Sequence, residues 1–457
     1  MNDAESDGGD EGEIERTIGL LGATTIGTGI MIGAGIFVFP GLAVGRVGPA
    51  ASVSFALGAV ISLLVALPAS ELATAMPKSG GGYYFISRGL GSLPGAIVGI
   101  GLVFGLVFAS AFYLVGLGEY IAEILVQAGV IGSTAVSLGP ASLVLGAGMV
   151  VGALLTALSI LGTENTESIQ NVVVALLVSI LLVFLSVSGL DILGVSGDTR
   201  LGGEFAPSGY GPVLSTAALV FTSYLGFVQV ATVAEDVVDP DRNLPLAMIG
   251  SVLLVGVLYV FTMLVAGYTF PANEIRMMGE TAIVQVAGAY LGFGGVIAIL
   301  IGGLLATISS ANASILSASR ALYGLSADDL VPEAAGQVNK RYSTPHFALS
   351  FVGGTAVALV AFGRTEVLAE VASFLHLILY GLICVALVVI RRRDPLWYEP
   401  SFTCPGYPVV PIVGGLGSFA LIGFMELLSQ VLGVAVSLVA VGWYLLYARD
   451  VQLKDDL

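Results

Sequence analysis

The sequence predicts an all-α membrane protein with twelve transmembrane helices. Two features of its composition point to this fold class: 56% of the 457 residues are hydrophobic and only 11% are charged. In addition, apolar stretches of about 20 residues, long enough to cross the hydrocarbon core of a bilayer, recur along the chain. The predicted spans are residues 17–45, 48–76, 93–126, 140–161, 169–189, 213–236, 244–270, 283–325, 346–363, 367–390, 408–428 and 431–448.

The first span is interrupted by glycine. Gly29, Gly33 and Gly35 fall within seven residues of an otherwise apolar stretch. Each glycine weakens a helix by about 1 kcal/mol relative to alanine. Backbone groups freed inside a bilayer survive only where protein covers them or where they line a polar cavity. A helix broken at mid-membrane depth is typical of the substrate sites of secondary transporters.

The sixth span carries a second interruption, at residues 222–227 (TSYLGF). Corresponding breaks in the first helix of two five-helix units indicate an inverted-topology repeat, with a site where the units meet. Because five is odd, consecutive units enter the membrane from opposite sides. The predicted parts are an acidic, disordered cytoplasmic tail (1–16), a first five-helix repeat (17–189), an extracellular loop (190–212), a second, inverted repeat (213–391), and helices eleven and twelve with the cytoplasmic C-terminus (392–457).

Lysine and arginine predict the orientation in the membrane. With the N-terminus inside, twelve of these residues fall in cytoplasmic segments and four in outer segments, as the positive-inside rule requires. An even number of spans then places both termini in the cytoplasm. The polar tail lacks the basic flank and the cleavage site of a secretory signal. We therefore expect a multi-pass protein of the plasma membrane.

The net charge of −16 comes partly from seven acidic residues among the first fifteen. Such a segment is expected to be solvated and disordered. Acidic loops and scarce lysine resemble the proteins of salt-loving archaea, because high salt screens acidic self-repulsion. The acidic balance argues against nucleic acid as a partner. Membrane lipid is the expected surrounding of the predicted spans. The basic run at 391–393 is expected to anchor the topology, and Cys384 and Cys404 suit neither a disulfide nor a zinc site.

Four motifs carry a resemblance to a known family. They are Gly29-x-x-Ile32-Gly33-Ala34-Gly35-Ile36-Phe37-x-x-Pro40-Gly41, residues 71–83 (ELATAMPKSGGGY), Gly226-Phe227 with residues 234–245 (AEDVVDPDRNLP), and residues 317–323 (SASRALY) with Asp328 and Pro332. In this order, over about residues 17–391, they resemble the amino acid–polyamine–organocation (APC) superfamily of secondary transporters. The resemblance implies a 5+5 inverted-repeat (LeuT-like) fold with two further C-terminal helices, in which helices 1 and 6 are discontinuous.

The resemblance also implies that the two breaks hold the backbone of an amino acid, and the freed backbone groups suit this. Free amides and the positive helix end at the first break favour a carboxylate by about 0.3–1 kcal/mol. Freed carbonyls at the second break accept from an ammonium. The predicted substrate-binding residues are Ile32, Gly33, Ala34, Gly35, Thr222, Ser223 and Leu225, and the candidate aromatic gates are Phe221, Tyr224 and Phe227.

A sodium site is predicted beside the first break. Resemblance to sodium-coupled symporters implies that the Ala306 carbonyl and the hydroxyls of Ser309 and Ser310, on one helix face, join the carbonyls of Gly29 and Ile32. Some proton-coupled members place a lysine of the fifth span here, and residues 170–189 contain none. Sodium is therefore favoured over a proton as the coupling ion, with ion-free exchange as an alternative. No other metal or cofactor is expected.

The expected substrate is a neutral or apolar amino acid, because no charged side chain can be placed in the predicted cavity. The alternative is a polyamine or organic-cation transporter, or an amino acid exchanger, of the same superfamily. A channel would show charged pore rings, an ATP-driven transporter a phosphate-binding loop, and an enzyme a clustered nucleophile and base. The sequence shows none of these, so an enzyme is not expected.

A few polar residues within or beside the predicted spans are further candidates, since ionisable groups inside a membrane are often functional. Gln229 lies just beyond the second break, His376 in span ten, and Glu119 near the outer end of span three. A further set forms either an inner gate of ion pairs or a capping and topology device: Glu71, Lys78, Arg88, Glu235 and Arg242.

Overall fold

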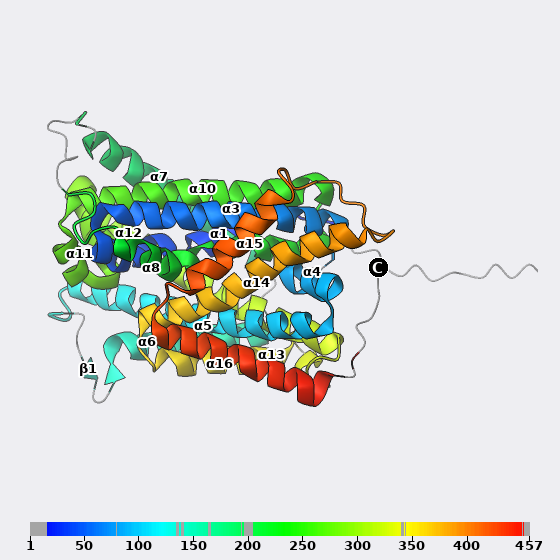
Figure 1. Ribbon diagram of the computed structural model, residues 1–457. Coiled ribbons are helices and arrows are strands. Elements are labelled where there is room, and N and C mark those ends of the chain that lie inside the picture. The colour runs from blue at the N-terminus through cyan, green and yellow to red at the C-terminus, as the bar shows by residue number, and fades with distance from the viewer. Residues whose placement is uncertain are drawn as a thin grey trace, which may run out of the picture.

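The computed structural model of the chain is a bundle of long helices (Figure 1). The structure describes residues 16–78, 80–133, 137–138, 141–162, 166–192, 194–195, 204–339, 342, 344–449 and 451. Almost all of the predicted acidic tail and part of the predicted loop 190–212 lie outside these residues. The division of the chain into repeats stays a prediction.

The elements follow one another along the chain as helices of very different length. The α-helices are α1 Leu20–Phe39, α2 Gly45–Val47, α3 Ala51–Ala75, α4 Gly81–Leu90, α5 Ser92–Gln127, α6 Leu143–Leu161, α7 Thr166–Ile192, α8 Gly211–Val220, α9 Gly226–Gln229, α10 Pro240–Thr269, α11 Ala272–Met278, α12 Ala282–Ala327, α13 His346–Val360, α14 Thr365–Arg393, α15 Val409–Ile422 and α16 Leu427–Trp443. The 3-10 or π-helical segments are η1 Pro40–Val44, η2 Gly48–Ala50, η3 Phe221–Tyr224, η4 Val230–Asp236, η5 Gly279–Thr281, η6 Glu333–Gly336 and η7 Tyr444–Ala448. A short antiparallel pair joins β1 Ser137–Leu138 and β2 Ala141–Ser142.

Nine helical segments among the described residues are long and apolar enough to cross a membrane. Two of them are 56 residues long: Leu20–Ala75, which contains α1 and α3, and Ala272–Ala327, which contains α11 and α12. Two shorter apolar helices, α13 and α15, accompany them. The all-helical, polytopic fold class is therefore confirmed, whereas the predicted total of twelve crossings stays a prediction.

The helices run between two ends of the bundle, which we call the termini side and the far side. The termini side holds the start of α1, the α4 helix and the end of α16, and the far side holds α11 and β1 (Figure 1). On the termini side, the backbone amides of Thr17 and Ile18 donate to the Asp236 carbonyl oxygen at 3.0 and 2.9 Å. These bonds fix the start of α1 beside η4.

Helices α5 and α12 pack against each other. Close approach here depends on a small residue, since a Cβ on Gly303 would overlap the ring of Tyr120. The Tyr120 hydroxyl in turn donates to the Phe37 carbonyl oxygen of α1 at 2.8 Å. Helices in lipid gain little from burying apolar surface, so small residues and hydrogen bonds of this kind hold them together.

Some elements were not expected from the sequence. The short helices α4 and α11 lie between predicted spans, and the β1–β2 hairpin occupies residues where the span 140–161 was expected to begin. Helix α4 starts at Gly81, directly after Gly80, and the φ values of 123° at Gly80 and 54° at Gly81 favour glycine. These elements are too short to give a membrane-span signal.

Candidate binding site between two interrupted helices

Helix α1 is interrupted at Gly33, whose φ of 17° and ψ of −135° are not helical. This residue lies against α12, because a Cβ built on it would overlap Ser310 Oγ and lie 3.0 Å from Ser310 Cβ. Ile32 and Gly35 flank the break and are fully buried or nearly so, while the side chain of Ala34 lies outside the described residues. The predicted break is thus present, and it faces α12.

The second interruption follows α8, where the helix changes to the 3-10 segment η3, a single turn of α9 and the 3-10 segment η4. Thr222, Ser223 and Leu225 are all buried here. Thr222 Oγ1 donates to the Ala369 carbonyl oxygen at 2.5 Å and lies 2.7 Å from Ser373 Oγ, both on α14. The Thr222 side chain therefore ties this break to α14.

The two interruptions are joined by the side chain of Tyr259 from α10. Its hydroxyl donates to the Met31 carbonyl oxygen of α1 and lies 3.3 Å from the Ser223 carbonyl oxygen. A Cβ on Gly35 would overlap this hydroxyl and would lie 2.8 Å from Ser223 Oγ. Gly35 and Ser223, which belong to the predicted substrate site, are consequently neighbours in the structure, brought together around a tyrosine that the prediction missed.

A second tyrosine, Tyr380 of α14, covers the carbonyls of the second break. Its hydroxyl donates to the Leu225 carbonyl oxygen at 3.0 Å and lies 3.3 Å from the Tyr224 carbonyl oxygen. Buried carbonyls need donors, and the two tyrosine hydroxyls supply them. An incoming ammonium would have to replace or share these donors.

The three candidate aromatic gates are buried among other rings. Phe221 and Phe227 lie 5.9 and 4.9 Å from the ring of Tyr380, measured between ring centres. Tyr224 packs against Tyr259 at 5.3 Å, and its hydroxyl donates to the Phe55 carbonyl oxygen at 2.8 Å. Their gating role stays a prediction.

The predicted ion ligands occupy the α1–α12 contact. Ser310 Oγ is buried and has no hydrogen-bond partner among the described residues, and Ala306 and Gly29 are also buried. Ser309 is only half-buried. A buried hydroxyl without a partner is unusual, and oxygen ligands suit a small hard cation. No group of three or more His, Cys, Asp or Glu in the described part of the chain could hold a metal ion.

Two cavities toward the termini side share part of their lining, and we call them together the vestibule. It has two lobes, about 450 Å³ beside α4 and α5 and about 290 Å³ beside α1 and α7. Gln229 lines both lobes, is 2% exposed, and its Oε1 has no hydrogen-bond partner among the described residues. Six residues line both lobes: Gln229, Thr232, Val233, Asp236, Ser317 and Arg320.

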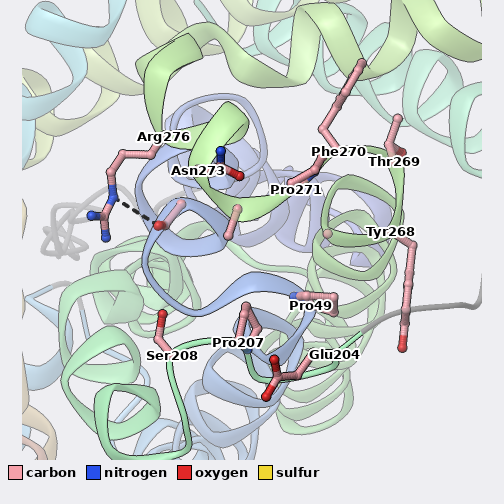
Figure 2. Close-up of a pocket in the computed structure, with 13 residues that line it drawn as sticks. Pro49, Glu204, Pro207, Ser208, Tyr268, Thr269, Phe270, Pro271, Asn273 and Arg276 are labelled. Carbon is pink, nitrogen blue, oxygen red and sulfur yellow. Dashed lines mark hydrogen bonds between the residues drawn. The ribbon is translucent and has the colours of Figure 1, made fainter.

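Ion pairs and a hydrogen bond to the backbone join segments on the far side. Arg46 pairs with Glu366, and Arg364 lies 3.4 Å from Glu426. Arg276 of α11 donates through Nε to the Gly45 carbonyl oxygen at 3.0 Å (Figure 2). A cavity of about 540 Å³ lies beside this contact. Figure 2 shows its lining, which comes from helix ends and loops of the far side and includes none of the predicted site residues whose side chains the structure describes.

The termini side holds a buried carboxylate, Glu71, that was predicted as part of a gate or cap. Arg391 donates to both carboxylate oxygens of Glu71 at 2.6 Å. The Tyr398 hydroxyl and the Cys404 backbone amide also donate to this carboxylate, at 2.6 and 2.7 Å. Burial raises the pKa of Cys404 to about 11 and also raises the pKa of Tyr398. The negative charge of Glu71 adds to both shifts, because it disfavours a second negative charge nearby. Both groups therefore stay protonated at neutral pH.

Other predicted gate and membrane residues lie in contacts that do not involve Glu71. Lys78 lies 4.0 Å from Glu235, and Arg88 lies 3.9 Å from Asp328, which also accepts from Tyr83 at 2.5 Å. His376 is buried in α14 and bonds through Nδ1 to the Ala372 carbonyl oxygen at 2.9 Å. The predicted gate set thus divides between at least three separate contacts.

Comparison with known proteins identifies the family. Residues 18–450 match the sequence model of the family described as "Amino acid permease". The chain is 29% identical to the branched-chain amino acid permease BcaP of Bacillus subtilis, covering 96% of this chain and 94% of that protein. It is 28% identical to the methylthioribose transporter of the same organism, over 97% and 95% of the two chains.

A third relative, the serine/threonine exchanger SteT of Bacillus subtilis, is 25% identical over 90% of this chain and 91% of its own. The salt-loving archaeal source expected from the composition stays a prediction. The match over nearly the whole length shows that the chain belongs to the amino acid permease family of the APC superfamily, whose members are membrane transporters rather than enzymes.

Proposed function

We propose that the protein is a secondary active transporter that moves a neutral or apolar amino acid across the plasma membrane by alternating access. The observation that carries this proposal is the pair of interrupted helices that meet at Tyr259. Main-chain amides at one break and main-chain carbonyls at the other recognise the two ends of a zwitterion without a buried charged side chain.

In this proposal, the two charged ends of the substrate backbone bind at different breaks. The amides of Gly33, Ala34 and Gly35 receive the carboxylate, favoured by the positive end of the restarted helix. The carbonyls of Thr222, Ser223 and Leu225 receive the ammonium. The hydroxyls of Tyr259 and Tyr380 hold the second break and the adjacent Met31 carbonyl in this state, so we expect substrate entry to rearrange them.

A neutral side chain is favoured because the groups that contact the breaks are uncharged. Tyr113, Ser310, Tyr259 and Ser223 lie nearest to the two site glycines. Two of the relatives are named for branched-chain amino acids and for serine and threonine. A polyamine or organic-cation transporter is the second candidate, and it would need acidic residues around the breaks. An exchanger of the same superfamily is the other alternative.

We also propose twelve spans in which two inverted units of five, 17–189 and 213–391, precede two further helices. Both interrupted helices are then the first of their unit, as the inverted-repeat arrangement requires. The termini side is the cytoplasmic side in this proposal, which agrees with the excess of lysine and arginine expected there. The vestibule would then open to the cytoplasm while ion pairs join the outer segments.

Sodium is the proposed coupling ion. The Ala306 carbonyl, the Ser309 and Ser310 hydroxyls, and the carbonyls of Gly29 and Ile32 would hold it. The buried Ser310 Oγ beside Gly33, which has no hydrogen-bond partner in the described part of the chain, supports this choice. A cation there would connect α1 to α12 and so favour the arrangement of the first break that binds substrate. A proton or ion-free exchange is the alternative.

Uptake of tritiated L-leucine into proteoliposomes tests both parts of the proposal. With the membrane potential fixed, we expect accumulation under an inward sodium gradient and a loss of about 5- to 150-fold when choline replaces sodium, the range typical of coupled sites. Ser310→Ala should remove this sodium dependence. Ser179→Ala is the matched control, because that hydroxyl is exposed on α7.

Two different failures are distinguishable in this assay. Leucine uptake that is equal with and without sodium would refute the sodium site and leave the transport function intact. An absence of uptake for leucine, serine and threonine alike would contradict the proposed function.

A further inference from the structure

The geometry points to a second amino acid site in the vestibule, separate from the site at the helix breaks. Arg320 would receive the carboxylate of a zwitterion, and Asp236 and Gln229 its ammonium. This inference rests on the proposed function, since it assigns the same class of ligand to a second position.

The first observation is the buried amide of Gln229. Its side chain is 2% exposed and lines both lobes, yet its Oε1 accepts no hydrogen bond from the described residues. Leaving a buried polar atom without a partner costs about 1–3 kcal/mol. The residue lines the vestibule while this oxygen is itself buried. A donor that reached it from the vestibule would satisfy it, and an ammonium is a donor with three N–H groups.

The second observation is a pair of opposite charges on the same cavity wall. Asp236 ends η4 and Arg320 lies in the last part of α12, and both line both lobes. Within the described residues, neither side chain forms a hydrogen bond or an ion pair. An acid and a base that share one cavity without bonding each other match the separated charges of a zwitterion.

The third observation is the size and the lining of the cavity. Lobes of about 450 and 290 Å³ can each hold a small molecule. Polar groups such as Thr232 and Ser317 lie beside apolar ones such as Val233, which lines both lobes, and Leu102, which lines the larger. Such a mixture accommodates a charged backbone together with an aliphatic side chain.

The vestibule site is distinct from the site at the helix breaks. Gln229 follows Gly226 by three residues, and Gly226 packs so closely on α1 that a Cβ would lie 2.5 Å from the Gly27 carbonyl oxygen. None of the predicted substrate-binding residues whose side chains the structure describes lines either lobe. A solute leaving the breaks toward the termini side would meet the vestibule next.

Cysteine protection tests this site in isolation. Ser317 lines both lobes, whereas the native Cys384 and Cys404 are buried. In a Ser317→Cys chain that also carries Gly35→Leu, the site at the breaks is blocked. L-leucine should still slow modification of the new thiol by a methanethiosulfonate reagent, by about tenfold at saturation.

Charge-removing variants identify the groups responsible. In the same background, Asp236→Asn and Arg320→Gln should each raise the leucine concentration for half-protection by about 10- to 100-fold, the loss expected for one charged hydrogen bond. The matched controls are Asp241→Asn at the start of α10 and Arg392→Gln in the last turn of α14, which remove the same charges from exposed positions. They should leave protection unchanged.

The inference is overturned if leucine gives no protection in the Gly35→Leu chain, or if protection survives both charge removals. Should Gly35→Leu fail to fold, the Ser317→Cys chain with Gly35 intact serves instead. There, two phases of protection are expected, and only the weaker should respond to Asp236→Asn. A single phase would refute the vestibule site, and leucine uptake by that chain would show that the proposed function itself still holds.

Discussion

Replacing Gly35 by leucine is expected to abolish amino acid binding while leaving the protein inserted in the membrane. The added Cβ alone would overlap the Tyr259 hydroxyl and press on Ser223. It would therefore displace the side chain that joins the two breaks and fill the space that a carboxylate must enter. Losing two hydrogen bonds to a charged group, at about 1.5–3 kcal/mol each, lowers affinity by 100-fold or more.

The measurement is equilibrium binding of tritiated L-leucine to purified protein in nanodiscs. Gly250→Leu is the matched control, because Gly250 lies in α10 and a Cβ there would meet nothing within 4 Å. Both variants should give the same elution profile in size-exclusion chromatography. Normal leucine affinity in the Gly35→Leu protein would remove Gly35 from the site.

Breaking the Glu71–Arg391 pair is expected to cause the largest loss of stability. Glu71 is fully buried, and Arg391 supplies two of its four hydrogen bonds. Arg391→Met would leave a buried carboxylate without its counter-charge, and this costs about 3–5 kcal/mol in other proteins. Adding Glu71→Gln to this variant should recover part of the loss, since the uncompensated charge is then gone.

Thermal stability can be followed as the fraction of monodisperse protein that remains after heating. Arg364→Met serves as the control, because the Arg364–Glu426 pair is about half exposed on the far side and such pairs contribute about 0–1 kcal/mol. Equal losses for Arg391→Met and Arg364→Met would show that the buried cluster does not hold the termini side together.

The outlines of the fold and the site could be predicted from local sequence because the bilayer imposes strong local rules. A run of apolar residues must be helical, so the spans appear in the composition alone. The glycines at 29, 33 and 35 mark a helix that cannot stay regular, and the structure places non-helical angles at Gly33. Both interruptions were predictable because they depend on neighbouring residues only.

Long-range contacts were not predictable in this way. Tyr259 meets Met31 across 228 residues, and Tyr380 meets Leu225 across 155. A tyrosine in an apolar span gives no sign of which carbonyl it will reach. Likewise, Arg391 looked like a topology anchor, although it pairs with Glu71, 320 residues away. Only covariation among related sequences, or the fold itself, would connect such residues.

The central claim is that two interrupted helices hold an amino acid by its charged ends. A cryo-electron microscopy structure of the protein with L-leucine tests it most directly. The proposal predicts leucine density between the breaks, with its carboxylate at the amides of Gly33–Gly35 and its ammonium at the carbonyls of Thr222–Leu225. Leucine bound only outside the breaks, with Tyr259 still bridging Met31 and Ser223, would contradict the claim.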